Sequence, residues 1–367
     1  MKIARSFSVT GAVLAAMGVV LGSLSPARAD ATIPMSPALQ KVIDGAKQEG
    51  KLTLSYAANI LGGPDGARVG AAGIKKMFGV DLDVTFYPGP SFAPMASKLL
   101  TEMQAGQPSS TDVYNGTAVE VTPQLSRGLF RRVPWVELYP NRITPGIVEG
   151  DSRAMRVTTK IPGILYNTKV APEFAQAHEM ADLLKPEYKG KLYTTPYLAG
   201  FDVLVAKDVW GFDKTAAFIK QYAQNIGGLA ACAATDRIAS GEIPGLALSC
   251  AGSEAKTDHY HGVIGQVPLL DAATRRFDYL CVPTNAAHPN AAILFTLFLA
   301  SPAGQLKIMH DIYGDELDSY TETATHQEIV QLQKEGAKFI DVTTDWWGSH
   351  PGINEDLGKL IKIVTKQ

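Results

Sequence analysis

The chain has 367 residues, with 34 Lys and Arg against 36 Asp and Glu, and 46% of its residues are hydrophobic. This balance of charge excludes a nucleic-acid binder that relies on a basic surface, and the hydrophobic fraction excludes a disordered chain. The length is sufficient for two lobes of roughly 150 residues each.

The first residues have the pattern of a secretory signal peptide. Lys2 and Arg5 precede an apolar stretch, Val9 to Leu24, and Ala27-Arg28-Ala29 is a small-x-small cleavage site. A membrane anchor is the alternative, but the stretch is short for a span of ~20 residues, and a cleavage motif follows it. We therefore predict removal of residues 1–29 and location in the periplasm.

The chain has three cysteines, Cys232, Cys250 and Cys281. In an oxidising periplasm two of them could form a disulfide, and the third would remain a thiol. Three small buried apolar side chains are the alternative. The spacing does not decide between these, because a disulfide depends on the separation of the Cα atoms in space.

The first predicted helix begins at Ser36-Pro37, a cap followed by proline at the first helical position, and ends at Gly50. A strand, 52–56, follows and leads into a loop rich in Gly and Pro. Ligands of open α/β sheets bind beyond the carboxyl ends of strands, so Tyr56 and Asn59 are candidate ligand-binding residues. A plain turn is the alternative.

A second candidate loop follows a predicted short strand, 111–114. Asn115-Gly116-Thr117 is predicted to open a helix, and free N–H groups at a helix start favour an anion or a carbonyl. Tyr114, Asn115 and Thr117 are therefore candidates for ligand binding. Simple capping of the helix by Asn115 or Thr117 is the alternative.

The residues from 161 to 196 predict a crossover into a second α/β lobe. The apolar run 161–166 is typical of a buried strand, and Gly190 makes the turn into another strand, 191–195. Between them lies a short helix that Pro186 ends, because proline bars the helical region for the residue before it. Two strands with this spacer fit such a crossover.

The end of strand 191–195 is the strongest site candidate. Tyr193, Thr194, Thr195 and Tyr197 place two phenols and two hydroxyls together, which suits a small organic ligand. Before the crossover, Arg153, Arg156 and Lys160 could each reach a ligand carboxylate. A solvated basic edge is the alternative for each of those three cations.

The order and spacing of several segments resemble a periplasmic solute-binding protein of the two-lobed iron, polyamine and organic-anion type, the receptor of an ABC importer. The central segment has the pattern YNT…DLL.PEYKGK, which ends at Lys191. Other matching segments are Ala46 to Tyr56, Asp112-Val113, Ala239 to Pro244 and His288 to Gln305. The resemblance runs from residue 38 to residue 310.

The resemblance implies an α/β, type II periplasmic binding protein fold. Each lobe would be a mixed sheet flanked by helices, with a hinge of two crossing strands near residues 154–166 and 279–284. Lobe 1 would comprise residues 30–155 and 280–367, and lobe 2 residues 156–279. In the family the strand end after residues 245–248 faces the cleft, so Arg237, Ser249 and Ser253 join the candidates.

The implied function is capture of a small polar or anionic organic solute and its delivery to an ABC permease in the inner membrane. We expect a monomer without catalysis, cofactor or nucleic-acid partner. A ferric-ion receptor of the same fold is the first alternative. It requires hard oxygen ligands close together, but Ser249, Cys250 and Ser253 stand where tyrosines would be expected, although Tyr56, Tyr193 and Tyr197 could substitute.

An exported hydrolase is the second alternative, and it has little support. The sequence contains no G-x-S-x-G, H-E-x-x-H, phosphate-loop or G-x-G-x-x-G motif. His259 and His261 could ligate a metal from an extended segment, but without a third ligand a surface loop is favoured. We therefore interpret the chain as a binding protein, not an enzyme.

Beyond Tyr313 the resemblance fades. Residues 325–334 and 355–364 predict helices, and the segment between them contains Trp346 and Trp347. This pair could cover the cleft, since exposed indoles bind apolar or cationic groups. Sealing of one lobe is the alternative.

Overall fold

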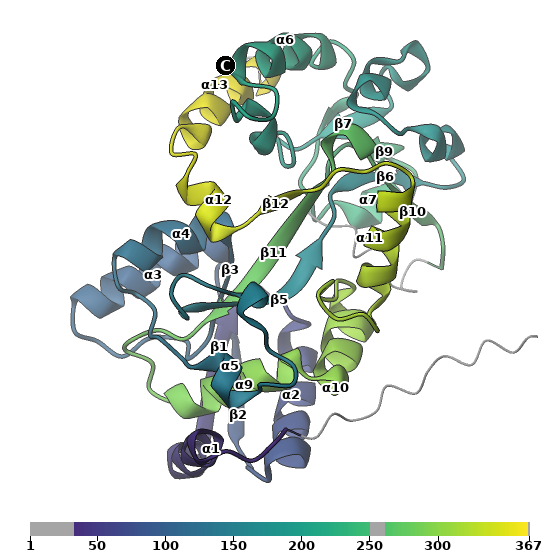
Figure 1. Cartoon of the computed structure of the whole chain (residues 1–367). Coiled ribbons are helices and arrows are strands. Elements are labelled where there is room, and N and C mark those ends of the chain that lie inside the picture. Colours follow the sequence, from purple (N-terminus) through teal and green to yellow (C-terminus); the bar gives the residue numbers. More distant parts are fainter. Residues whose placement is uncertain (1–32, 250–260, 366–367) are drawn as a thin grey trace, which may run out of the picture.

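The computed structural model describes residues 33–249 and 261–365, and it consists of two bodies joined by long strands (Figure 1). We call the body that contains β1 and β2 the lower lobe, and the body that contains β6 to β10 the upper lobe. The predicted signal peptide, Ser253 and His259 lie outside the described residues.

A parallel pair of strands, β1 (Lys51–Tyr56) and β2 (Asp83–Pro88), forms part of the lower lobe. Helix α9 (Pro289–Ala300) contacts β1 and lies against both α1 (Pro37–Glu49) and α2 (Gly63–Phe78). Because it is covered on several sides, α9 is buried over ten consecutive residues. The other elements before the central sheet are α3 (Phe92–Gln104), α4 (Ala118–Ser126), α5 (Trp135–Leu138) and η1 (Pro145–Ile147).

A five-stranded sheet occupies the centre of the molecule. Strand β11 (Thr274–Cys281) pairs antiparallel with β5 (Ala154–Lys160) and with β3 (Tyr114–Thr117), and parallel with β12 (Ile340–Val342). Strand β4 (Val148–Glu149) pairs with the far edge of β5. Strands β5 and β11 run between the two lobes (Figure 1).

The upper lobe is built on a mixed sheet in the order β10-β6-β9-β7-β8. The chain passes directly from β5 into β6 (Gly163–Asn167), and from β10 (Ile264–Pro268) through a short turn, η7 (Leu270–Ala272), into β11. The other elements are η2 (Pro172–Gln176), η3 (Met180–Leu184), η4 (Pro186–Tyr188), β7 (Leu192–Thr194), η5 (Asp202–Val205), α6 (Phe212–Tyr222), β8 (Gly228–Leu229), α7 (Thr235–Ala239) and β9 (Gly245–Leu246).

The first predicted helix is confirmed in detail. The Ser36 hydroxyl accepts a hydrogen bond from the backbone N of Leu39 at 3.1 Å, and Gly50 ends α1 with a φ of 63°. Glycine takes this left-handed conformation without the steric cost that a Cβ would add. The helical turn η3 likewise ends at Leu184, before Pro186, as predicted.

The helix predicted to open at Asn115-Gly116-Thr117 begins later, and the alternative that Thr117 caps it is confirmed. Asn115 lies in β3 opposite Leu280, because β11 extends its antiparallel ladder over this segment, and α4 begins three residues later with Thr117 as its cap. After Tyr197 the chain forms only a short helical turn, η5. Gly200, with a φ of 79°, interrupts the helical path just before it.

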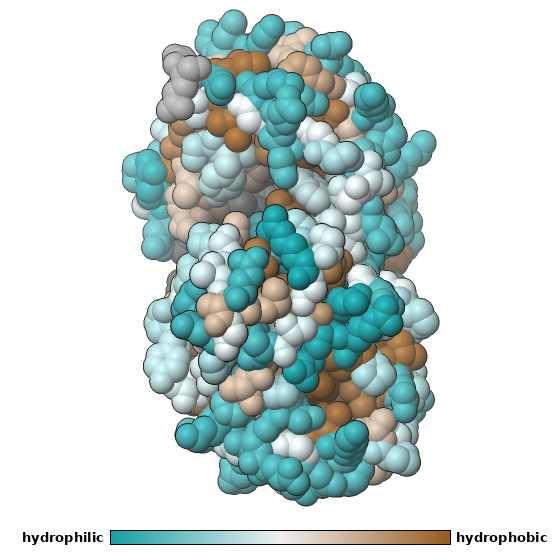
Figure 2. All heavy atoms as spheres, turned by 90° about the vertical axis from the view of Figure 1, so that its left-hand side faces the viewer, coloured by the Kyte–Doolittle hydropathy of each residue, from teal (hydrophilic) through white to brown (hydrophobic). Residues whose placement is uncertain are grey.

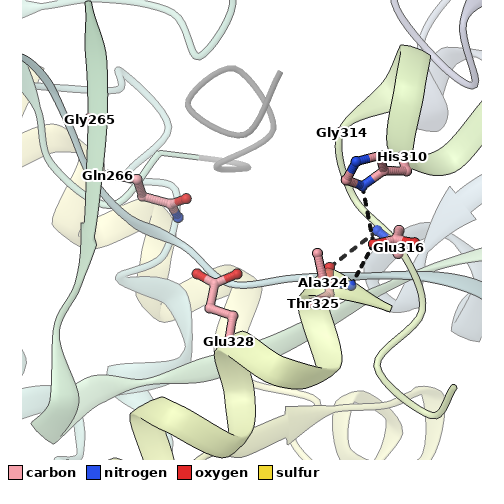
Figure 3. Close-up of a pocket in the computed structure, with 8 residues that line it drawn as sticks. All are labelled: Gly265, Gln266, His310, Gly314, Glu316, Ala324, Thr325 and Glu328. Carbon is pink, nitrogen blue, oxygen red and sulfur yellow. Dashed lines mark hydrogen bonds and ion pairs between the residues drawn. The ribbon is translucent and has the colours of Figure 1, made fainter. Parts of the chain in front are cut away.

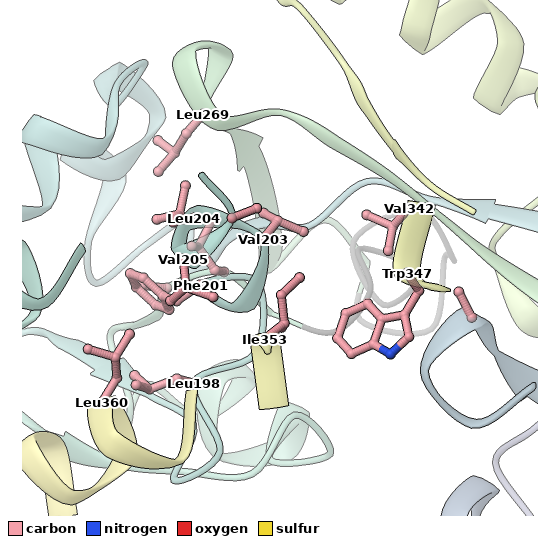
Figure 4. Packing of buried hydrophobic residues seen from close by; sticks show 14 of the residues in the cluster. Leu198, Phe201, Val203, Leu204, Val205, Leu269, Val342, Trp347, Ile353 and Leu360 are labelled. Atoms are coloured by element: carbon pink, nitrogen blue, oxygen red, sulfur yellow. The ribbon is translucent and has the colours of Figure 1, made fainter. Parts of the chain in front are cut away.

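The C-terminal segment crosses between the lobes a third time, which the sequence did not predict. After α11 (Ala324–Lys334) the chain forms β12 beside β11, then α12 (Thr344–Gly348) against α4 of the lower lobe. It ends in α13 (Ile353–Thr365), which packs on η5 and α6 of the upper lobe. Figure 4 shows Ile353 and Leu360 beside Phe201 and other apolar side chains of the upper lobe.

The two tryptophans of this segment have different surroundings. Trp347 is buried in the hydrophobic core, on the same side as Val342 (Figure 4). Trp346 is partly exposed and stacks on the ring of His350 with a centroid distance of 4.3 Å. His350 in turn contacts Asp208 of the upper lobe, with Nε2 and Oδ1 3.0 Å apart.

No single helix in residues 33–249 and 261–365 is long and apolar enough to cross a membrane. Helix α9 and the helical stretch that follows it, α10 (Pro302–Gly304) with η8 (Gln305–Tyr313), reach the necessary length and composition only as a pair, and this pair is bent by 75°.

Of the cysteines, Cys281 is a free, fully buried thiol in β11, whereas Cys232 is disulfide-bonded. Burial raises the pKa of the Cys281 thiol well above its ordinary value, and the nearby charge of Glu149 adds to this effect. Cys250 lies outside the described residues.

Candidate functional site

A cavity of about 290 Å³ lies where the two lobes, the crossing strands and the C-terminal segment meet. Figure 2 shows the face of the molecule hollowed between its upper and lower lobes. The described lining consists of Phe92, Thr117, Ala118, Val119 and Glu120 from the lower lobe, Tyr197 to Gly200, Asp202 and Ser249 from the upper lobe, and Lys160, Pro162, Arg276, Phe277, Asp278, Val342 and Leu357 from the segments between them.

Strand β11 brings two opposite charges to this cavity. Arg276 and Asp278 are two positions apart in the strand, so their side chains leave it on the same side. Lys160, at the end of β5, lies opposite Arg276 in the ladder. Burial of ionised side chains costs free energy unless their charges are paired.

Lys160 and Asp278 form one such pair, with Nζ and Oδ2 2.9 Å apart. The hydroxyl of Tyr313 donates to the same Oδ2 at 2.8 Å and accepts a hydrogen bond from Lys160 Nζ at 2.8 Å. Burial alone would lower the pKa of Lys160, but the charge of Asp278 and the contact with Tyr313 outweigh it and raise that pKa. Lys160 is therefore held as a cation.

Arg276 forms the second pair, with Asp202 of η5. The guanidinium contacts both carboxylate oxygens, with Nη1 to Oδ2 at 3.0 Å and a further bond from Nη2 to Oδ1. Bidentate pairing of this kind fixes the orientation of both groups. Asp202 is 6% exposed, so the pair is largely shielded from water.

Glu120 is the third carboxylate of the cavity. It lies in the first turn of α4, where its Oε2 accepts hydrogen bonds from the backbone N of Thr117 at 3.1 Å and from Thr117 Oγ1 at 2.7 Å. Burial raises the pKa of the Glu120 carboxyl, and the charge of Asp278 acts in the same direction, although the bonds from Thr117 oppose both. Glu120 caps its helix and also faces the cavity.

Three of the predicted site residues line the cavity together: Thr117, Tyr197 and Ser249. Tyr197 is 43% exposed, and its hydroxyl accepts a hydrogen bond from the backbone N of Cys232 at 3.1 Å. Thr195 stabilises the turn that contains Tyr197, because its Oγ1 accepts a hydrogen bond from the backbone N of Ala199 at 2.7 Å. Thr194 is fully buried beside it.

None of the other predicted site residues that the structure describes lines this cavity. Tyr56 is buried against Phe86, and Tyr114 is buried with its hydroxyl donating to the backbone oxygen of Phe92 at 3.1 Å. The remaining four are Asn59, which is exposed; Asn115, which donates to Tyr279 O at 3.4 Å; Tyr193, which packs on the apolar cluster around Leu246; and Arg237, which pairs with Glu242 at 2.7 Å.

Sequence reasoning missed most of the charged lining, namely Glu120, Asp202, Arg276 and Asp278, and it considered Lys160 only as one of three basic residues. One usable signal was present. Asp278 stands among the apolar residues Phe277 and Tyr279 to Cys281, and a charge buried in such a segment requires a partner or a ligand. The partners themselves come from distant parts of the chain and leave no local pattern.

A second cavity, of about 420 Å³, lies between β10 and the η8–α11 region. Figure 3 shows Gln266 and Glu328 on opposite sides of it, and His310 beside Glu316, with Nδ1 to Oε2 at 3.3 Å. Among residues 33–249 and 261–365, no group of three or more His, Cys, Asp or Glu could hold a metal ion. None of the predicted site residues lines this second cavity.

The model of a family described as bacterial extracellular solute-binding protein matches residues 71–315 of the chain. The match spans more than half of the sequence, and the chain belongs to this family. No curated protein matches the sequence.

Solved structures of ABC-transporter and periplasmic binding proteins are similar in fold. The periplasmic binding protein AfuA from Actinobacillus pleuropneumoniae, with fructose-6-phosphate bound, has a TM-score of 0.64 at 17% identity, covering 86% of this chain and 99% of that one. The spermidine/putrescine-binding protein PotD from Streptococcus pneumoniae has a TM-score of 0.60 at 16% identity, covering 85% and 99%. A ferric binding protein from Campylobacter jejuni has a TM-score of 0.60 at 16% identity, covering 86% and 98%.

These likenesses confirm the predicted type II, two-lobed α/β fold. The family consists of solute-binding proteins, which agrees with the interpretation of the chain as a binder and not an enzyme.

Proposed function

We propose that the protein is the periplasmic substrate-binding component of an ABC importer. It captures a small polar organic solute in the cavity between its lobes and delivers it unchanged to a permease in the inner membrane, acting as a monomer. The observation that carries this proposal is the position of the cavity, which is lined by both lobes and by the strands that join them. Ligands that bind at such a junction favour closure of the lobes.

We propose the division expected from the sequence, with residues 30–155 and 280–367 in lobe 1, residues 156–279 in lobe 2, and 1–29 as the signal peptide. Strands β5 and β11 serve as the hinge. The last helix is an exception that we add, because α13 packs on η5 and α6 and so moves with lobe 2.

The site residues of this proposal are Thr117, Tyr197 and Ser249, joined by Glu120, Lys160, Arg276 and Asp278. The sequence also predicted an anion as one possible solute. The charges of the cavity give no support to an anion, because Lys160 and Arg276 already pair with carboxylates.

A ferric-ion receptor remains the alternative, and one of the similar structures binds ferric ion. In the described lining of the cavity, Tyr197 is the single tyrosine. Tyr56 and Tyr193, the other phenols proposed as ligands, lie outside this lining, so the arrangement favours an organic solute.

The test begins with the protein purified from the periplasm. Native mass spectrometry should detect a noncovalently bound solute, and the stripped protein should regain thermal stability when that solute is returned, because a ligand that binds only the folded state raises its stability. Cells that lack the gene should lose uptake of the same solute. Undiminished uptake in those cells would contradict the proposal.

A further inference from the structure

We propose that the solute is a small organic cation with one positive charge, an ammonium compound, and that Glu120 and Asp278 are the acidic residues that select it. This inference rests on the receptor function proposed above, and it narrows the class of solute. It is argued from the charges that face the cavity, from their partners and from the size of the space.

Five ionisable side chains with fixed positions surround the cavity. Lys160 and Arg276 are cations, and Glu120, Asp202 and Asp278 are carboxylates, so the described lining carries one more negative charge than positive. A ligand with a single positive charge would balance it. An anion would add a second uncompensated negative charge in a space where water screens poorly.

Each cation already pairs with a carboxylate, and of the guanidinium nitrogens of Arg276 only Nε lacks a hydrogen-bond partner among the described residues. Arg276 is held at both oxygens of Asp202, and Lys160 Nζ contacts both Asp278 Oδ2 and the Tyr313 hydroxyl. Release of either cation would leave a buried carboxylate without its partner, which is strongly destabilising. An anionic solute that took either cation from its carboxylate would therefore have to break an existing pair.

One carboxylate retains unused capacity to accept hydrogen bonds. Asp278 is fully buried and lines the cavity, and its Oδ2 receives both bonds described above. Its Oδ1 accepts no hydrogen bond from the described residues. A buried acceptor without a donor is costly, so the carboxylate of Asp278 is short of donors, and its charge favours a cation over an anion nearby.

Glu120 adds a second acidic group close to Asp278. Its carboxylate bonds to Thr117, the β3 residue that pairs with Asp278 in the central sheet. The charge of Asp278 contributes to raising the pKa of the Glu120 carboxyl, so the two carboxylates repel each other, and a cation beside them would relieve this repulsion. Phe92 and Tyr197 supply aromatic rings to the same lining, and ring faces attract ammonium groups.

The volume limits the solute further. A cavity of about 290 Å³ lies at the lower end of the range for small-molecule sites, roughly 300–1,000 Å³. The lining has an excess of one negative charge, so a compound with one ammonium group balances it. A compound with two separated ammonium groups does not. The second charge of such a compound would have no carboxylate left to pair with.

The experiment compares four-carbon probes of matched size on the stripped, full-length mature protein by isothermal titration. They are 4-hydroxybutylammonium, 1,4-butanediammonium, 1,4-butanediol and 4-hydroxybutyrate. We expect the first to bind at least roughly 10-fold more tightly than the diol or the carboxylate. Tightest binding by 4-hydroxybutyrate or by the diol would overturn the inference and leave the receptor function intact.

Two Glu→Gln variants, one in each cavity, test where the probe binds. Glu120→Gln keeps an oxygen that can accept from Thr117 and removes the charge, so the affinity for 4-hydroxybutylammonium should fall about 10-fold while that for the diol stays unchanged. Glu328→Gln, in the second cavity, is the control and should alter neither affinity. The inference is wrong if Glu328→Gln weakens binding and Glu120→Gln does not, or if no probe saturates the protein. The receptor function is judged separately, from the solute that copurifies.

Discussion

Thr344, at the start of α12, donates two hydrogen bonds to Glu149 of β4, from its backbone N at 2.7 Å and from its Oγ1 at 2.6 Å. The other oxygen of Glu149 accepts from the Tyr279 hydroxyl at 2.9 Å and from Arg156 Nε at 2.5 Å. One carboxylate thus fastens the C-terminal segment to both crossing strands, β5 and β11.

Replacement of Glu149 by alanine should lower the free energy of unfolding by about 3–5 kcal/mol, because Arg156 would be left as a largely buried cation without its partner. Urea denaturation followed by circular dichroism measures this. Glu355→Ala is the control: its carboxylate pairs with Lys359 at 3.0 Å but is 78% exposed, so the loss should stay below about 1 kcal/mol. Equal losses in the two variants would refute the role assigned to Glu149.

Leu357 should limit the size of the solute, because it contributes to the cavity wall from α13. Leu357→Trp should weaken binding of the copurified solute by at least roughly 10-fold, since the indole fills space that the solute needs. Titration calorimetry measures the affinity, and thermal unfolding checks that the fold persists. Lys362→Trp places the same ring on the exposed side of the same helix and should leave the affinity unchanged.

The stability of the solute-free protein should depend on pH through Glu120. Its pKa in the folded state is raised above the ordinary 4.5, mainly by burial, so the folded state binds this proton more tightly than the unfolded state does. The contribution of Glu120 to stability is therefore greatest below pH 4.5 and declines as the pH rises through the raised pKa.

Glu120→Gln lacks this decline, so its melting temperature should rise relative to that of the wild-type protein between pH 4 and pH 7. Scanning calorimetry of both proteins across that range provides the comparison. A difference in melting temperature that stays constant with pH would show that burial does not perturb this carboxyl.

Cys281 should resist thiol reagents in the native protein. Its side chain is fully buried, and its raised pKa keeps it as the unreactive thiol. Iodoacetamide should label it only after denaturation, as peptide mass spectrometry would show, and Cys281→Ala should abolish that labelling. Rapid labelling of the native protein would indicate that β11 opens far more readily than its pairing with three strands suggests.

The sequence predicted those features that depend on neighbouring residues. Ser36, Pro37 and Gly50 define α1 because capping and left-handed glycine act within a few positions. Asn115 was assigned to a helix because its preference for caps was the only local signal, while its pairing with Leu280 depends on a strand 165 positions later. Long-range pairing of this kind overrides local preference.

The same limit applies to the site. Thr117, Tyr197 and Ser249 follow strands or open a helix, so the rule that ligands lie beyond strand ends led to three residues that line the cavity. Glu120, Asp202 and Asp278 became recognisable only once folding placed them around one space. The cationic partners of two of these carboxylates, Arg276 and Lys160, are 74 and 118 positions away from them.

The third passage of the chain between the lobes has a consequence for biosynthesis. Val342 and Leu357 belong to the wall of the cavity, and they follow the strands of both lobes in the chain. A nascent chain can form β1 and β2 early, but it has no complete binding pocket until residues 342–357 have been synthesised. Truncated products of this gene, even those that retain the β1-β2 pair and the sheet of the upper lobe, would therefore lack one side of the site.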